Sequence, residues 1–406
     1  MRLLPLLSIT VVVFFIVVCY YENGDYMYVV EKASETSFIK RFDYILFTSV
    51  MILSVIGLIA VESATRTMPN GKNMMSIQTI SVVLGVVLAI IVSLIDYKVY
   101  KELGWVLFGI STLLLVYVLF RGYGEQELGS SSWLRLPGGI SFQPSEIAKI
   151  TFIITVSHYL ERIKEENKKL DYLKLIAVAV IPIALIILQP DYGTSMVFIF
   201  TLFVMLFVWG IKYKYLFMAL GLFVTAAPFI WVFMLNDARR KRIIEFLFPG
   251  SDPLGSSLQV ERAKMAIGSG RLFGSGIGKG IQTQNVGSGV PVKESDFIFT
   301  VIGEEMGFVG ASVVIILIFV ILLRCLIIAK RSRDLYGSYI VAGITGMFGF
   351  HFFENIGMNI GLLPVTGLPL PFVSQGGSAM VTNFIAIGLV LSVSARRKQT
   401  LFNTDD

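Results

Sequence analysis

Apolar runs of about 15 to 25 residues recur along the whole chain, and they constrain its fold more than any other feature. A soluble core cannot enclose them all, because 55% of the 406 residues are hydrophobic and only 15% are charged. Backbone polar groups in lipid must be satisfied within the chain, so the spanning elements are expected to be helices. The sequence therefore predicts an all-α, polytopic membrane protein with about ten spans. They lie at 44–61, 76–95, 103–120, 144–160, 173–188, 194–210, 214–235, 297–329, 336–359 and 377–395.

The positions of Lys and Arg predict how these spans are oriented, because short cytoplasmic loops carry an excess of both. Placing Lys40 and Arg41 inside brings the other strongly basic short loops inside as well. The basic segment 236–296 is expected outside, since a loop of about sixty residues is exempt from the rule. The net charge of +6 then reflects membrane topology, and no nucleic-acid partner is expected.

Residues 3–20 form a further apolar run that is similar to a signal sequence. No small-residue cleavage motif follows it, and the basic residues of FIKRFDY favour a cytoplasmic position after it. We predict an extra span with an external N-terminus, and the alternative is a peripheral or dispensable extension. The expected organisation is an N-terminal segment at 1–40, a transmembrane domain at 41–395 with one large extracellular loop, and a cytoplasmic tail at 396–406.

The first conspicuous outer stretch is GSSSWLRLPGGISFQPSEIAKI, which carries Trp133 and Arg135 and then enters a helix at a proline. Glu146 and Lys149 are three residues apart, so they share one face about one turn into the membrane. The structural interpretation is an interfacial Trp anchor, a Glu that suits the helix dipole and a Lys that reaches back to the interface. Ionisable residues inside a membrane are usually functional, and a lysine here could bind phosphate oxygens.

Two further stretches place polar residues where apolar helices meet. LQPDYGTSMVF carries Gln189 and Asp191 between two helices with almost no loop, and Asp191 could simply cap the second helix. A Pro- and Gly-rich segment at 358–383 carries Ser374 and Gln375 before the last span. Irregular backbone at membrane depth persists only where protein buries it or where it lines a polar cavity.

A fourth stretch begins with the glycine-rich segment 261–280 and ends in VPVKESDFIFTVIGEEMG. Its glycines could approach a ligand closely, although no buried strand precedes them as in nucleotide-binding loops. Asp296 lies at the outer entrance of an apolar helix, and Glu304 follows about two turns deeper on a similar face. The structural alternative for Asp296 is an N-cap.

Five motifs in order make the chain similar to the SEDS family (shape, elongation, division and sporulation) of RodA, FtsW and their sporulation relative. They are FQPSEIAK, QPDYGTS, AIGSGRLFGSGIGKG, SDFIFTVIGEEMGFVG and NIGMNIGLLPVTGLPLPFVSQGGSAM, and the resemblance runs from about residue 40 to residue 395. It implies a ten-helix peptidoglycan glycosyltransferase that polymerises lipid II into glycan strands outside the bacterial cytoplasmic membrane. It also implies a class B penicillin-binding protein, a transpeptidase, as partner.

The family's essential acidic residue matches Asp296, its loop Trp matches Trp133 and its helix-four Lys matches Lys149. The sequence departs from the family in the N-terminal run, in NVGSGVPVKES, and in Gln375 where Tyr is frequent. VSQGGSA and KGIQTQ favour the RodA-like, elongation branch, with a division or sporulation role as the alternative. The candidate substrate-binding residues are Trp133, Arg135, Glu146, Lys149, Gln189, Asp191, Glu304, Ser374 and Gln375.

The implied reaction joins a sugar 4-hydroxyl to an anomeric carbon that carries undecaprenyl pyrophosphate. It needs a base for the hydroxyl, for which Asp296 is the candidate, and positive charge for the pyrophosphate, for which Lys149, Arg135 or residues of the 261–280 loop are the candidates. A divalent cation such as Mg²⁺, held by Asp296, could bridge carboxylate and pyrophosphate, although no metal-ligand spacing is evident. A lipid II flippase and a non-catalytic scaffold are the alternative functions. The small residues of GITGMFGF, at 343–350, either admit the partner's anchor helix or pack within the chain.

Overall fold

The computed structural model describes residues 41–124, 131–135, 141–229, 231–232, 237–248, 256–285 and 289–397. The predicted extra span at 3–20 and most of the cytoplasmic tail lie outside these residues. The described part is helical apart from turns and one small hairpin, as an all-α membrane protein requires.

Nine of the ten predicted spans each correspond to one helix, and the span predicted at 297–329 corresponds to α14 together with a separate short helix before it. These helices are α3 (Tyr44–Thr65), α4 (Gly71–Leu94), α5 (Tyr97–Arg121), α7 (Pro144–Glu166), α8 (Lys169–Leu188), α9 (Tyr192–Trp209), α10 (Tyr213–Phe229), α14 (Gly307–Lys330), α15 (Leu335–Asn359) and α16 (Gly377–Ala395). Among the described residues, seven helices are long and apolar enough to cross a membrane, namely α3, α4, α5, α8, α9, α14 and α16. Helix α10 is 17 residues long. Helices α7 and α15 differ from the seven because they carry ionisable side chains inside the bundle, among them the buried Glu146, Lys149 and Glu354.

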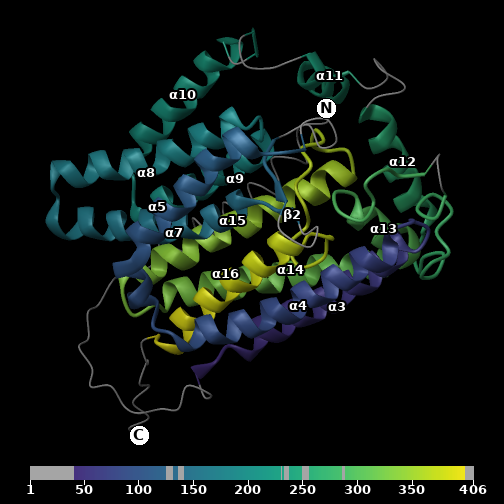
Figure 1. Ribbon diagram of the computed structural model, residues 1–406, viewed down its shortest axis with the longest axis horizontal. Coiled ribbons are helices and arrows are strands. Elements are labelled where there is room, and N and C mark those ends of the chain that lie inside the picture. The colour runs from purple at the N-terminus through teal and green to yellow at the C-terminus, as the bar shows by residue number, and fades with distance from the viewer. Residues whose placement is uncertain are drawn as a thin grey trace, which may run out of the picture.

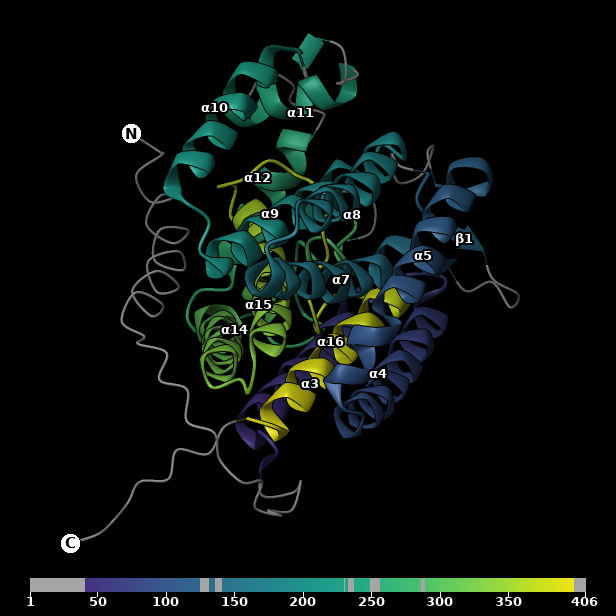
Figure 2. The same ribbon diagram turned by 90° about the vertical axis from the view of Figure 1, so that its left-hand side faces the viewer.

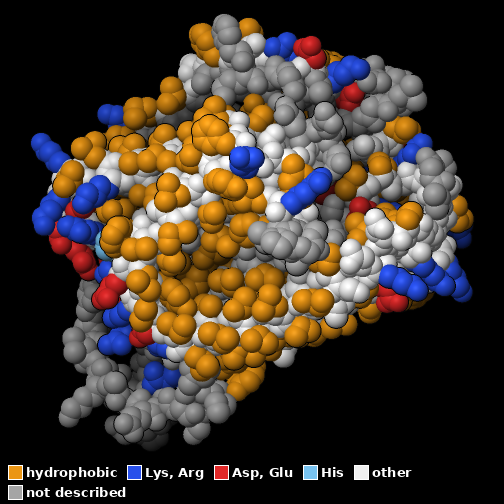
Figure 3. Space-filling model, viewed as in Figure 1, with side chains coloured by type: hydrophobic (Ala, Val, Ile, Leu, Met, Phe, Trp, Pro, Cys, Tyr) orange, Lys and Arg blue, Asp and Glu red, His pale blue; other side chains and the backbone are white. Residues whose placement is uncertain are grey.

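Helices α7, α15 and α16 occupy the interior of the bundle, and the more apolar helices surround them (Figures 1 and 2). The apolar stretch of α16 is 78% buried, whereas those of the other six apolar helices are 22% to 44% buried. Figure 3 shows hydrophobic side chains across the middle of one face and most Lys, Arg, Asp and Glu side chains toward its two ends. This surface suits a bilayer, which solvates an exposed apolar belt between polar ends.

Aspartates begin three helices at the end of the bundle that the charge rule places inside. Asp43 accepts the Leu46 N–H at the start of α3, and Asp96 and Asp334 cap α5 and α15 in the same way. Such caps satisfy N–H groups that have no partner within the helix. Asp43 also forms an ion pair with Arg324, so the cap ties α3 to α14.

The single span predicted at 297–329 is wrong, because the structure divides it into α13 (Ile298–Glu305) and α14. The division falls at Gly307, whose φ of +67° suits glycine and would strain other residues. Chain that follows α12 (Ser256–Ser269) fills the break: Phe308 N–H donates to the Arg271 carbonyl at 2.8 Å, and Ser275 N–H donates to the Glu304 carbonyl at 2.9 Å. The freed backbone groups therefore find partners inside the protein. Helix α11 (Asp237–Leu247) is a further short helix of the outer segment.

Two of the three glycines of GITGMFGF, Gly343 and Gly346, do not face an open groove for a partner helix, whereas a Cβ on Gly349 would meet nothing within 4 Å. A Cβ on Gly343 would lie 2.7 Å from an Ile153 side-chain atom, and one on Gly346 would lie 2.9 Å from Val204. Both glycines therefore let α15 pack closely on α7 and α9. The prediction of a docking site at 343–350 is wrong for these two positions, and intramolecular packing explains them.

Candidate active site

Asp296 lies on a turn just before α13, and its side chain is half-buried. Helix α13 begins at Ile298, and the Asp296 side chain does not cap it. The cap comes instead from α15, where Asn359 Oδ1 accepts the N–H of Thr300 at 3.1 Å and its hydroxyl at 2.6 Å. The N-cap interpretation of Asp296 is therefore wrong.

The backbone of the Asp296 turn is held from two sides. The side-chain amides of Asn355 and Asn359 each donate to the Asp296 carbonyl at 2.9 Å. From the segment before α16, the Ser374 hydroxyl donates to the Ser295 carbonyl, and Gln375 N–H donates to the Glu294 carbonyl at 2.9 Å. The carboxylate accepts a 2.9 Å bond from the Ser295 hydroxyl. The two predicted residues Ser374 and Gln375 thus lie against this turn and fix its position.

Lys149 and Glu146 form the buried pair that their spacing predicts. Their side chains lie 3.0 Å apart, and each residue is only 3% exposed. Lys149 Nζ also lies 3.1 Å from Nε2 of His351 on α15. Lys149 therefore does not reach back to the interface, and the interpretation of a snorkelling lysine is wrong.

Helix α15 connects Lys149 to the Asp296 turn. His351 contacts Lys149 and Asn355 holds the Asp296 carbonyl, and these two residues are four apart on the same helix. Four residues span about 6 Å along a helix axis. The two groups that sequence analysis assigned to base and phosphate chemistry are thus anchored about one turn apart on a common support.

Trp133 and Arg135 lie in a small outer hairpin of β1 (Leu134–Arg135) and β2 (Ser141–Phe142), paired antiparallel with Leu134 opposite Phe142. Arg135 is exposed and stacks its guanidinium 4.4 Å from the centre of the Tyr123 ring. The Ser378 hydroxyl at the start of α16 donates to the Ser141 carbonyl at 3.2 Å. The hairpin therefore stands over the same end of α16 that borders the Asp296 turn.

Asp191 and Gln189 make structural contacts at the α8–α9 junction. Asp191 caps α9 by accepting the Thr194 N–H at 3.1 Å, and its other oxygen accepts from the Gln143 amide at 3.0 Å. Gln189 is buried and donates to the Leu115 carbonyl at 2.9 Å. These contacts bring the starts of α7 and α9 together, and a direct substrate role for either residue stays a prediction.

Glu304 and its neighbour Glu305 are buried, and their oxygens bind the loop that follows α12. Glu304 accepts the N–H groups of Gln282 and Thr283, both at 2.8 Å. Glu305 accepts the Gly278 N–H at 2.9 Å and the Ser63 hydroxyl. Glu304 therefore holds the loop that follows α12 through backbone amides, and a direct substrate role for it stays a prediction.

Lys293 brings a positive charge into the same region, three residues before Asp296. It is buried, and its ammonium donates to the Thr283 carbonyl and, at 3.3 Å, to the Thr67 hydroxyl. Burial lowers the pKa of Lys293, and the charges of the nearby Glu294, Glu305 and Glu304 carboxylates act in the opposite direction. Lys293 therefore helps to balance the buried glutamates.

The described residues contain no group of three or more His, Cys, Asp and Glu side chains that could hold a metal ion. A bound Mg²⁺ commonly uses only one or two carboxylates and completes its shell with substrate phosphates and water. The half-exposed Asp296 carboxylate suits such a shared site, although the protein groups alone do not form one.

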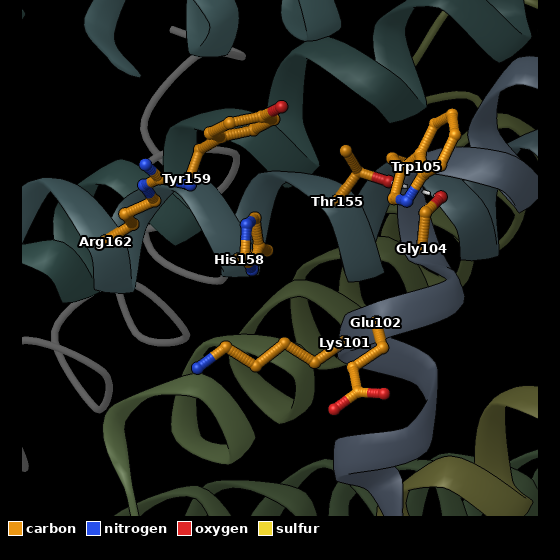
Figure 4. A pocket seen from close by; sticks show the side chains of 8 residues that line it. All are labelled: Lys101, Glu102, Gly104, Trp105, Thr155, His158, Tyr159 and Arg162. Atoms are coloured by element: carbon orange, nitrogen blue, oxygen red, sulfur yellow. Dashed lines mark hydrogen bonds between the residues drawn. The ribbon is translucent and has the colours of Figure 1, made fainter.

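A cavity of about 230 Å³ lies near the opposite end of α7, between α7 and α5 (Figure 4). Lys101, His158 and Arg162 line it, and Arg162 is thirteen residues beyond Lys149, or about 20 Å along the helix. Lys101 is paired with Glu161, and Arg162 with Asp171. Because carboxylates already neutralise these cations and Asp296 is far away, the cavity is not part of the candidate site.

No site role was predicted for His351, Glu354, Asn355 and Asn359, although all four are buried on α15. Their spacing of three, four and eight residues from His351 places them along one helix face. A polar stripe at this spacing inside an otherwise apolar span was the signal that could have identified them.

Comparison with known proteins agrees with the architecture. Residues 41–399 match the cell cycle protein family of FtsW, RodA and SpoVE. The probable peptidoglycan glycosyltransferase FtsW of Geobacter metallireducens is 32% identical over 373 residues, 89% of this chain and 97% of the relative. Stage V sporulation protein E of Bacillus subtilis is 35% identical, over 87% and 96%. Peptidoglycan glycosyltransferase MrdB of Escherichia coli is 32% identical, over 86% and 93%.

Solved structures show the same fold. A chain of a peptidoglycan synthase complex that coordinates polymerization and crosslinking superposes with a TM-score of 0.75 at 29% identity, covering 88% of this chain and 99% of the other. The rod shape determining protein RodA of Thermus thermophilus superposes with a TM-score of 0.65 at 28% identity, over 88% and 98%. The chain is therefore a multi-pass membrane protein that belongs to the SEDS family of FtsW, RodA and SpoVE.

Proposed function

We propose that the protein is a peptidoglycan glycosyltransferase that polymerises lipid II at the outer face of the cytoplasmic membrane. The observation that carries the proposal is the position of Asp296, whose side chain does not cap α13 and whose backbone carbonyl is held by α15 about one helical turn from the residue that contacts the buried Lys149. Relatives that match along nearly their whole length are named as such transferases.

Asp296 is the proposed general base. It takes the proton of the acceptor 4-hydroxyl as the oxygen bonds to the donor's anomeric carbon and the bond to pyrophosphate breaks. Because its side chain is half-exposed while its backbone is held by Asn355 and Asn359, a substrate can reach a carboxylate whose position is fixed. Lys149 is proposed to stabilise charge on the departing pyrophosphate, with Arg135 above it on the hairpin.

The charge pattern supports an outward-facing site. The cavity end of α7 and the start of α5 carry Arg162 and Lys101, and an excess of basic residues is typical of cytoplasmic loops. Helix α13, which directly follows the Asp296 turn, lies toward the opposite end of the bundle (Figure 1). A donor whose lipid tail stays in the bilayer would present its pyrophosphate there.

A divalent cation such as Mg²⁺ fits the proposal, since Asp296 could share it with the substrate's phosphate oxygens. When bound, the cation would neutralise charge on the leaving pyrophosphate. Lys149 supplies positive charge to the same region in any case.

The proposed role is cell elongation in a complex with a class B penicillin-binding protein. Relatives from the FtsW, SpoVE and MrdB branches are 32% to 35% identical, so the preference for elongation rests on VSQGGSA and KGIQTQ alone. The partner proposal is supported by the likeness to a chain of a peptidoglycan synthase complex.

The decisive experiment is polymerisation of purified lipid II by the purified protein, with and without the transpeptidase, in wild-type and Asp296→Asn forms. Loss of a positioned general base should lower the rate by roughly a hundredfold or more. Glu294→Gln is a matched control, because it neutralises a carboxyl two residues away that has no assigned chemical role. Glycan synthesis by Asp296→Asn at the wild-type rate, with the partner's own synthesis excluded, would refute the mechanism. Inactivity of the wild type under all conditions would favour a scaffold.

A further inference from the structure

Glu354 is a buried carboxyl that the proposed reaction does not use. It lies on α15 between His351, which contacts Lys149, and Asn355, which holds the Asp296 carbonyl. Glu354 is 3% exposed, and its Oε2 atom has no hydrogen-bond partner in the described part of the chain. A carboxyl at this depth is costly, so its contacts need a reason.

The other oxygen of Glu354, Oε1, accepts a hydrogen bond from the hydroxyl of Thr366. Thr366 belongs to the turn 364–368, whose Leu368 carbonyl accepts from the Asn355 amide at 2.8 Å. Two neighbouring residues of α15 therefore hold this turn by hydrogen bonds. Glu354 binds it at Thr366, and Asn355 binds it at Leu368.

The turn 364–368 stands directly against the proposed base. Gly367, next to Thr366, has a φ of +80°, and a Cβ there would lie 3.4 Å from Asp296 Oδ2. The turn thus forms one wall of the space around the Asp296 carboxylate, and its position depends on the Glu354–Thr366 bond.

We propose that Glu354 is a positioning residue. Through Thr366 it fixes the turn 364–368, which forms one side of the space around the Asp296 carboxylate. This inference rests on the proposed function of Asp296. It makes α15 the support of three parts of the site at once, namely Lys149, the Asp296 backbone and the turn beside the Asp296 carboxylate. Residue 354 must therefore carry a carboxylate or amide oxygen that can reach the Thr366 hydroxyl.

The test is a double-mutant cycle on lipid II polymerisation that measures kcat and KM separately. Glu354→Met and Thr366→Val each remove the bond. Each should lower kcat by about tenfold with KM for lipid II little changed. A full displacement of about 1 Å can cost roughly a hundredfold, and loss of this one bond should displace the turn by less than that. The double variant should be no slower than the slower single variant, because both changes remove the same interaction. Glu354→Gln and Thr366→Ser keep an acceptor and a hydroxyl, so they should retain most of the turnover.

Thermal unfolding of each variant separates this effect from misfolding, and the Thr366→Ser and Thr366→Val pair keeps the test informative if Glu354→Met does not fold. Wild-type kcat in Thr366→Val, additive losses in the double variant, or a loss in Glu354→Gln equal to that in Glu354→Met would each overturn the proposal. Asp296→Asn is measured in the same assay. If it is inactive while the Thr366 and Glu354 variants are normal, the proposed function stands and only this inference fails. If Asp296→Asn is fully active, the proposed function itself fails.

Discussion

Replacing Lys149 by Met tests whether this lysine serves the fold, the chemistry or both. Lys149 and Glu146 are each 3% exposed and lie 3.0 Å apart, so removing the ammonium leaves a carboxylate buried without its counter-charge. Breaking a buried pair from one side costs about 3–5 kcal/mol of stability. Glu146 Oε2 already lacks a hydrogen-bond partner in the described residues, which makes relief by local rearrangement difficult. We therefore expect Lys149→Met to unfold at a clearly lower temperature.

The double variant Lys149→Met/Glu146→Gln separates the two roles. It removes both charges, so no unpaired charge stays buried and the cost of breaking the pair from one side is avoided. Its thermal stability should therefore return close to that of the wild type. Its polymerisation should stay about ten- to a hundredfold low, because a charge-assisted bond worth about 1.5–3 kcal/mol to the pyrophosphate is still missing. Lys149→Arg should restore only part of the rate, since its planar fork differs from a compact ammonium.

The assay is lipid II polymerisation in nanodiscs, with thermal unfolding measured on the same preparations. Glu146→Gln alone is the control for the loss of the carboxylate. Recovery of both stability and polymerisation in the double variant would show that Lys149 only balances Glu146, and the phosphate role would be abandoned.

Three further changes have defined outcomes. Gly307→Ala should lower the thermal unfolding temperature, because the residue has a φ of +67° and a new Cβ would lie 2.3 Å from a backbone atom. Gly349→Ala is the control and should not lower it, since a Cβ there meets nothing within 4 Å. Asn359→Leu should lower kcat for lipid II more than KM changes, since it removes the α13 cap and one of the two bonds to the Asp296 carbonyl; an unchanged kcat would contradict the anchoring argument. The lowered pKa of Lys293 means that the unfolded chain holds this proton more tightly, so stability relative to Lys293→Met should rise as pH increases from that lowered pKa toward 10.5. A stability difference that does not vary over this range, measured by chemical unfolding, would show that burial does not control this lysine.

The sequence predicted those features that depend on residues close together in the chain. The spans follow from local hydropathy, and the start of α7 at Pro144 follows from the preference of proline for the first turn of a helix. The Glu146–Lys149 pair follows from the i, i+3 geometry of a helix. The Asp191 cap is a further local signal that the structure confirms.

Features that depend on distant segments were not accessible in this way. The apolar run through 297–329 reads as one helix, because nothing local shows that the chain after α12 supplies hydrogen-bond partners at Gly307. Asp296 resembles a helix cap for the same reason. The residue that caps α13 in its place, Asn359, lies sixty-three positions later in the chain. Rules based on local sequence assign the capping of a helix terminus to the nearest suitable side chain. In a folded chain, a side chain from another helix can instead bind the unpaired N–H groups of that terminus.

The way α13 is capped bears directly on how the Asp296 turn is held. Asn359 accepts from Thr300 at the start of α13, so the Asp296 side chain does not serve as the cap. The Asp296 backbone is fixed by Asn355 and Asn359, and its carboxylate accepts a bond from the Ser295 hydroxyl. A neutral amide therefore does the capping and the holding, which positions a half-buried carboxylate for proton transfer without committing it to the helix terminus.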